Sequence, residues 1–130
     1  MSTTSQRQNP EHGAAVDPFR QIAEAAPIGI VHATPSGIVL FVNQAWRDIT
    51  GITAPTPIAY EVIDEMVHPD DRDRIVGLYL EAAETLEPFE AELRLIRADG
   101  DIRHVRIQGR PLSVDGRLDG FTGTTLDITD

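Results

Sequence analysis

The sequence His68-Pro69-Asp70-Asp71 brings an imidazole and two carboxylates together within four residues. Such a set could bind a metal ion or act as an acid–base pair. The same residues suit the start of a helix, because proline fits the first turn and acids are stabilised there by free amides and the helix dipole. We favour the helix start, and we predict neither a metal site nor a catalytic residue in this chain.

A second group of charged side chains lies in the last third of the chain, which has the pattern of two joined hairpins. Residues 90–97 and 102–111 alternate polar and apolar side chains on either side of Ala98-Asp99-Gly100. A second turn at Asp115-Gly116 leads into residues 121–126. Period-two alternation with Asp-Gly turns is typical of antiparallel hairpins.

Register decides which of these side chains share a face, because a slip of one residue turns every side chain over. Two turns place the apolar and the ionic residues on opposite faces of the sheet. They are a three-residue loop that ends in a left-handed Gly100 and a two-residue turn at Asp115-Gly116. On the apolar face the predicted pairs are Leu93 with Val105, Ala91 with Ile107, Val105 with Leu126 and Ile107 with Thr124. On the ionic face they are Glu92 with Arg106, Arg94 with His104 and His104 with Asp127.

The elements that must position these residues follow from the rest of the pattern. Residues 1–16 lack an apolar period and predict a flexible tail, and Asp17-Pro18 predicts the start of a flanking helix over 17–26. Further strands are predicted over 29–33 and 38–42, and helices over 43–49, 59–67 and 68–86. This order predicts one α+β domain over residues 17–130, with an antiparallel sheet and helices grouped on one side.

Composition narrows the function classes. The formal net charge is −10, which disfavours direct binding to nucleic acid or to an anionic membrane. The sequence contains no cysteine, so disulfides and cysteinyl cofactor adducts are excluded. It has no stretch typical of a membrane span or a secretory signal, and we therefore expect a cytoplasmic protein.

Five short motifs in order resemble the PAS domain family with its C-terminal PAC segment, the sensory box. They are residues 26–30, residues 37–45, residues 68–72, the set Glu92, Arg94, Asp99-Gly100, Gly116 and Gly123, and the closing Asp127-Ile128-Thr129. The resemblance covers residues 19–129 and implies a five-stranded antiparallel sheet with helices over one face. It also implies a non-enzymatic module that senses, dimerises and signals to an output domain. The chain departs from the family pattern at His104, where Trp or Tyr is common, and only Asp130 follows the terminal motif.

The apolar and aromatic candidates for a ligand pocket are equally candidates for ordinary core packing. They are His32, Phe41, Trp46, Tyr60, Ile63, Met66, Ile75, Tyr79, Leu93, Leu95, Val105, Ile107 and Leu126. The candidates for signal relay are Glu92, Arg94, His104, Arg106, Asp127 and Thr129. The hypothesis is that a small hydrophobic ligand or a partner biases the core packing, and that the last strand carries this bias to Asp127 and Thr129.

Several alternatives stay open at this point. We predict no cofactor, but haem, with His32 as a ligand, or a non-covalent flavin would make the chain a cofactor-bearing sensor. The oxygen sensors of the family it resembles place a haem histidine on the long helix, and residues 70–86 contain no histidine. A small α+β enzyme of the ketosteroid-isomerase type is the rival from another class, and it needs a carboxylate or histidine base in its cavity. The expected partners are a second copy, bound through residues 17–25 and the outer sheet face, and the output part of a histidine kinase, cyclase or transcription regulator in a two-component or related system.

Overall fold

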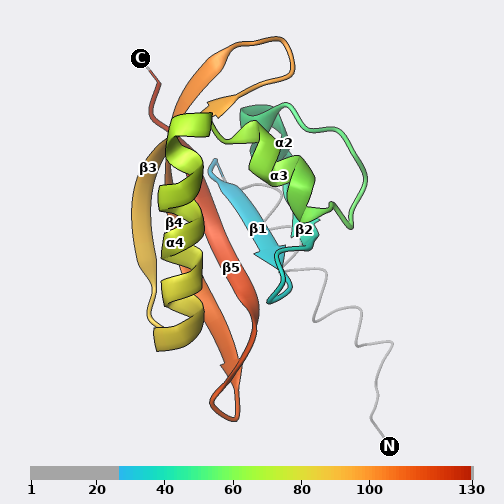
Figure 1. The fold of residues 1–130 in the computed structure, drawn as a ribbon. Coiled ribbons are helices and arrows are strands. Elements are labelled where there is room, and N and C mark those ends of the chain that lie inside the picture. The colour runs from blue at the N-terminus through green and yellow to red at the C-terminus, as the bar shows by residue number, and fades with distance from the viewer. Residues whose placement is uncertain (1–26, 130) are drawn as a thin grey trace, which may run out of the picture.

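The computed structural model describes residues 27–129 and shows a five-stranded antiparallel sheet with helices on one face (Figure 1). The strands lie in the order β2-β1-β5-β4-β3. The elements are β1 Gly29–Ala33, β2 Val39–Val42, α2 Gln44–Thr50, α3 Tyr60–Met66, α4 Pro69–Thr85, β3 Phe89–Ile96, β4 Ile102–Val114 and β5 Arg117–Asp127. The predicted α+β class is confirmed. The predicted tail over 1–16 and helix over 17–26 lie outside the described residues.

The short helix α2 is tied to the sheet by a single buried amide. Asn43 caps the helix, because its side-chain oxygen accepts a hydrogen bond from the backbone N–H of Trp46 at 3.0 Å. The same oxygen accepts from the N–H of Ile30 at 2.8 Å, and the amide nitrogen donates to the carbonyl of Ile28 at 3.0 Å. Gly51 ends the helix in the left-handed conformation. One residue therefore fixes both the start of α2 and its position against β1.

The long helix α4 begins where the charged motif predicts it. Pro69 occupies the first turn, and the Nδ1 atom of His68 accepts a hydrogen bond from the N–H of Asp70 at 3.1 Å. Asp70 and Asp71 lie in the first turn, at the positive end of the helix dipole. The helix-start interpretation of His68-Pro69-Asp70-Asp71 is confirmed.

The first hairpin has the predicted register. Leu93 lies opposite Val105 and Glu92 opposite Arg106. Gly100 has the left-handed conformation that the three-residue loop requires, with φ 88°. Val105 is 0% exposed, so this hairpin turns its apolar face to the helices.

The register of the second hairpin was predicted wrongly, by one residue. Val114 does pair with Arg117, as the two-residue turn requires, but Leu112 pairs with Gly120 and Ser113 with Leu118. Asp119 therefore has no partner and forms a β-bulge. Beyond it Val105 lies opposite Asp127 instead of Leu126, Ile107 opposite Thr125 instead of Thr124, and Arg106 opposite Leu126.

Gly120 makes this bulge possible. Its φ is 156°, and a β-carbon added there would lie 2.6 Å from the carbonyl oxygen of Ala33 on β1. Only glycine lets the two backbones approach this closely. An isolated glycine within a strand pattern is the one sequence signal that indicates such a bulge.

Two neighbouring clusters of buried side chains form the core on the helical face of the sheet. One joins α4 to β3 and β4 around Ile75, Leu93 and Val105. The other joins β2 to α2 around Val42 and Trp46. In Figure 1 α4 runs along the sheet over β3 and β4, while α2 and α3 lie toward β1 and β2. The helical face therefore carries the core, and the opposite face is not covered by described residues.

We expect Gly120→Ala to destabilise the protein by about 1–3 kcal/mol, because the new methyl group meets the Ala33 carbonyl in a strained backbone conformation. Urea unfolding followed by circular dichroism measures the change. Gly77→Ala is the matched control, since no atom lies within 4 Å of its added β-carbon and it is helical. That variant should gain about 0.5–1 kcal/mol. Equal stability of the two variants would contradict the role given to Gly120.

Candidate functional site

A cavity of about 390 Å³ lies between the helices α3 and α4 and the inner face of the sheet. This volume falls at the lower end of the range for small-molecule sites, roughly 300–1,000 Å³. Ten of the predicted pocket residues line it: Trp46, Tyr60, Ile63, Met66, Ile75, Tyr79, Leu93, Leu95, Val105 and Ile107. Their position around one cavity is shown, and their role in binding stays a prediction.

Three of the predicted pocket residues do not line this cavity. His32 and Phe41 lie opposite each other on β1 and β2, on the outer face of the sheet. Leu126 also lies on the outer face and is 42% exposed, because the bulge at Asp119 moves it opposite Arg106. The same shift turns Thr125 inward, where it is 5% exposed and lines the cavity. Sequence reasoning missed Thr125, although Gly120 carried the signal for the shift.

The cavity opens to solvent beside α3 and α4. Tyr60 is 39% exposed and Leu80 is 65% exposed, yet both line the cavity, so they mark its opening. The charged residues of the lining are Asp64 and Arg72. No pattern in the sequence indicated either of them, because their place at the cavity depends on how α3 and α4 pack together.

The carboxylate of Asp71 joins α4 to the edge strand β3. Its two oxygens accept hydrogen bonds from the Arg94 guanidinium, Nε at 3.1 Å and Nη2 at 2.9 Å. A third bond comes from the backbone N–H of Arg94 at 2.9 Å. The Asp71 side chain is 8% exposed. Hydrogen bonds from Arg94 hold the pKa of Asp71 far below its ordinary value, against the opposing effect of burial.

Neighbouring groups of the same helix end complete the contact with β3. The N–H of His68 donates to the carbonyl of Arg94 at 2.9 Å, and the Arg74 guanidinium donates to the carbonyl of Glu92 at 2.9 Å. Arg94 was predicted as part of an outer row, which is the set of ionic side chains expected on the outer sheet face: Glu92, Arg94, His104, Arg106 and Asp127. Its register position opposite His104 is confirmed, but its side chain is held by Asp71 at the sheet edge.

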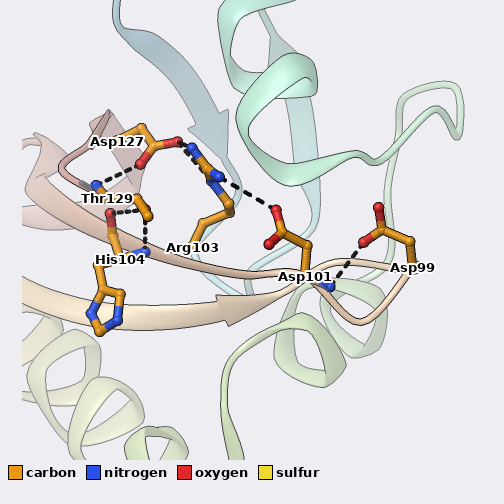
Figure 2. Close-up of polar contacts among 6 residues, drawn as sticks. All are labelled: Asp99, Asp101, Arg103, His104, Asp127 and Thr129. Carbon is orange, nitrogen blue, oxygen red and sulfur yellow. Dashed lines mark hydrogen bonds and ion pairs between the residues drawn. The ribbon is translucent and has the colours of Figure 1, made fainter.

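Asp127 is not part of the outer row, and its predicted pairing with His104 is wrong. Because it lies opposite Val105, its carboxylate meets Arg103, whose Nε and Nη2 donate to one carboxylate oxygen at 3.0 and 2.8 Å. Figure 2 shows this contact, with the His104 imidazole pointing away from it. Burial alone would raise the pKa of Asp127, but hydrogen bonds from Thr129 and Arg103 outweigh burial and lower it. The sequence analysis missed Arg103 because it used the wrong register between β4 and β5.

Thr129 extends the pairing of the last strand. Its hydroxyl accepts a hydrogen bond from the N–H of His104 at 2.7 Å, and its own N–H donates to Asp127 at 2.9 Å (Figure 2). The N–H of Ile128 donates to the carbonyl of His104 at 2.8 Å. The terminal motif is therefore bound to the start of β4 through both backbone groups of His104.

What remains of the outer row is an exposed ion pair. The Arg106 guanidinium lies 3.0 Å from the carboxylate of Glu92, as the predicted register implies. Both side chains are largely in solvent, where such a pair contributes at most about 1 kcal/mol. The His104 side chain is exposed.

The residues around the cavity do not fit the cofactors of sensory proteins that need a histidine or a cysteine. Among the described residues no histidine lines the cavity, and the sequence has no cysteine. The part of the chain in the structure contains no cluster of His, Cys, Asp and Glu placed to hold a metal ion. None of the helices described is long and apolar enough to cross a membrane.

The sequence model of the PAS fold family matches residues 18–128. The "Uncharacterized protein y4lL" of Sinorhizobium fredii is 35% identical over 86% of this chain and 14% of its own length. The "Blue-light-activated histidine kinase" of Brucella anthropi is 25% identical over 88% of this chain and 23% of its own length. The chain thus spans less than a quarter of either relative.

Among solved structures, a PAS domain from Colwellia psychrerythraea matches with a TM-score of 0.75. The match covers 88% of this chain and 98% of that one, at 18% identity. At this identity the likeness shows the fold alone.

We expect Asp71→Asn to destabilise the protein by about 1.5–3 kcal/mol at pH 7, because it removes a carboxylate that accepts charged hydrogen bonds from Arg94. The lowered pKa means that the contribution of Asp71 is present above its ordinary pKa of 3.8 and is lost as the pH falls below that value. The stability difference between wild type and variant should therefore shrink between pH 5 and pH 2, roughly.

Urea unfolding over this pH range measures both effects. Asp73→Asn is the control, since Asp73 is exposed and lies near Asp71 on the same helix. An Asp71→Asn deficit that does not change with pH would contradict the ionic role of the carboxylate.

Proposed function

The chain belongs to the PAS fold family, and on this premise we propose that it is a sensory module that binds a small, mainly apolar molecule and relays the event to a cytoplasmic output partner. The observation that carries the proposal is one cavity whose wall includes β5, the strand that ends in the terminal motif. Thr125 lines the cavity, and Asp127 lies two residues further along the same strand face.

The position of the cavity supports ligand sensing. Its wall joins α3, α4 and the inner face of the sheet, so a molecule inside contacts elements that are far apart in the sequence. A ligand that fits one packing of these elements better than another shifts the population toward that packing. The ligand-binding role of the ten lining residues is part of this proposal.

The relay runs along β5 to its end. Asp127 is held by Arg103, and Thr129 is held by the backbone of His104, so a shift of β5 relative to β4 changes both contacts. These contacts fix the direction in which the chain leaves the sheet. We therefore assign the relay to Arg103, Asp127 and Thr129, and give Glu92 and Arg106 a lesser part at the exposed face.

The output is proposed by analogy with a relative. The Brucella anthropi relative is named a histidine kinase, and this chain corresponds to 23% of its length. We propose that this chain signals to a histidine kinase or a comparable output part. The PAS assignment also replaces the isomerase alternative, and we propose no catalytic role for the chain.

A cofactor-bearing sensor is the second candidate that the comparison raises, because the same relative is named as activated by blue light. The chain has no cysteine for a flavin adduct, which leaves a non-covalent flavin. An absorption spectrum of protein expressed with flavin and haem supplied separates the candidates. Bands in the visible region would favour the cofactor sensor over a colourless ligand.

We expect ligand removal to loosen the terminal motif. Protein as purified and protein stripped on a hydrophobic resin are compared by native mass spectrometry, which detects the bound molecule. Hydrogen exchange of the same samples should be faster at the Ile128 and Thr129 amides after stripping, because both amides are hydrogen-bonded next to the Arg103–Asp127 contact.

Arg103→Gln tests the relay within this experiment. It should make exchange at Ile128 and Thr129 fast with or without the ligand. Arg110→Gln, an exposed change on the same strand, should behave as wild type. A purified protein without any bound molecule argues against ligand sensing, and a ligand effect that survives Arg103→Gln argues against this relay.

We also propose that the outer sheet face forms a homodimer. It presents Leu126, which is 42% exposed on the central strand, next to Arg106 and Glu92. A two-fold axis places the same patch on both subunits, so a surface that carries both charges around an apolar centre complements itself. The predicted share of residues 17–25 in this contact lies outside the described residues.

Leu126→Arg should convert the dimer to a monomer, because it places a second cation opposite Arg106 and removes the apolar centre. Light scattering over a concentration series measures the mass. Leu80→Arg is the control, since Leu80 is also exposed but lies on the helical side at the cavity opening. Wild-type protein that stays monomeric at high concentration would refute the dimer.

A further inference from the structure

The hydroxyl groups around the cavity fall into two sets. In the first set each hydroxyl already has a partner in the protein. The Tyr60 hydroxyl donates to Asp64 at 3.3 Å, and the Thr122 hydroxyl donates to the carbonyl of Val31 at 3.3 Å. The Thr50 hydroxyl accepts from the N–H of Ile52 at 3.1 Å, and that of Ser36 lies 3.1 Å from the Thr34 hydroxyl. These groups need nothing from a ligand.

The second set consists of Tyr79 and Thr125. Within residues 27–129 neither side-chain hydroxyl has a hydrogen-bond partner, although both line the cavity. The ring of Tyr79 is held in place by edge-to-face contacts with Phe89 and Phe121, with centroids 4.8 and 5.2 Å away. Thr125 is 5% exposed. Two positioned hydroxyls therefore face an apolar cavity without acceptors.

A hydroxyl that lines a cavity and has no protein partner binds a water or a ligand. Burial and the nearby Tyr60 raise the pKa of the Tyr79 hydroxyl, so it stays protonated and is able to donate a hydrogen bond. An acceptor oxygen on a ligand, such as a carbonyl, is the complement of this group.

The charges around the opening select against an anionic ligand. Arg72 is occupied, since its Nε donates to the carbonyl of Val67 at 2.9 Å and its Nη2 to the carbonyl of Glu65 at 3.1 Å. Asp64 lies in the lining, and α3 carries two more acids, Glu61 and Glu65. A carboxylate or phosphate entering here meets more negative than positive charge, because Asp64, Glu61 and Glu65 outnumber Arg72.

We propose that the cavity binds an uncharged, mainly apolar molecule with an acceptor oxygen, such as that of a carbonyl, for Tyr79 or Thr125. This inference rests on the proposed function and names the ligand class of the same site. The interior supplies apolar contact on all sides, and the two hydroxyls supply the specificity. A hydrocarbon of the same shape leaves these donors unpaired, and an acid of the same shape is repelled at the opening.

Three probes of nearly equal shape test this ligand class on the full chain. They are 2-acetylnaphthalene, which is neutral and carries a carbonyl, 2-isopropenylnaphthalene, which replaces the oxygen by carbon, and 2-naphthoate, which is an anion. Equilibrium dialysis gives the three dissociation constants. We expect the ketone to bind about three- to tenfold more tightly than the hydrocarbon, the range that one or two net hydrogen bonds supply. The anion should bind more weakly than the ketone.

Two conservative variants locate the effect. Tyr79→Phe and Thr125→Val each remove one hydroxyl and keep the side-chain shape, so the variant that lacks the donor to the carbonyl should weaken ketone binding and leave hydrocarbon binding unchanged. The hydrocarbon affinity thus reports that the cavity is intact. Thr124→Val is the matched control, because Thr124 is the neighbour of Thr125 on β5, pairs with Gln108 and does not line the cavity. That variant should bind both probes as wild type does.

The inference is overturned if ketone and hydrocarbon bind equally, if both variants bind the ketone as wild type does, if the anion binds most tightly, or if no probe binds. Each outcome is distinguishable from failure of the proposed function, which is judged by the molecule retained in native mass spectrometry and by exchange at Thr129. A retained molecule that is an uncharged ketone, amide or ester supports the inference directly.

Discussion

The unpaired backbone of the edge strand β3 is the constraint on which the helical layer depends. An edge strand presents N–H and C=O groups that need partners. Here the N-terminal end of α4 and its cap residue supply them. The Asp71 carboxylate accepts from the N–H of Arg94, the N–H of His68 donates to the Arg94 carbonyl, and the Arg74 guanidinium donates to the carbonyl of Glu92. These bonds hold the start of α4 beside the sheet edge, while Tyr79 packs against Phe89 and Phe121 further along. The cavity is the space left between a helix held at these points and the inner sheet face.

The second determinant is the bulge at Asp119, because it decides which side chains of β5 point toward the cavity and which point toward the outer face. It turns Thr125 toward the cavity and Leu126 toward the outer face, and it brings Asp127 to Arg103. One strand thus contributes a polar group to the cavity, an apolar residue to the exposed face and a carboxylate to the terminal contact. The proposed ligand site, dimer surface and relay share β5 for this reason, and a change in its position affects all three.

Much of the architecture was predictable from local patterns. Alternation with Asp99-Gly100 determines the first hairpin and its register, and His68-Pro69-Asp70-Asp71 determines the start of α4. The apolar positions of α4, β3 and β4 predicted most of the cavity lining. The failures on the last strand have one physical source, since a single extra residue in a strand reverses the face of every residue that follows. The wrong placement of Leu126 and Asp127, and the absence of Thr125 from the prediction, all come from it.

By itself the sequence determined the elements, their order and the inward face of the first hairpin, because period-two and helical patterns act over a few residues. Only the tertiary structure decided which residues meet across the chain. The partnership of Asp71 with Arg94 spans 23 residues, and that of Arg103 with Asp127 spans 24. Glycine is required at position 120 because the Ala33 carbonyl oxygen of β1 lies 2.6 Å from where a β-carbon would be. Such contacts depend on strand order, bulges and helix placement together, and no local pattern contains that information.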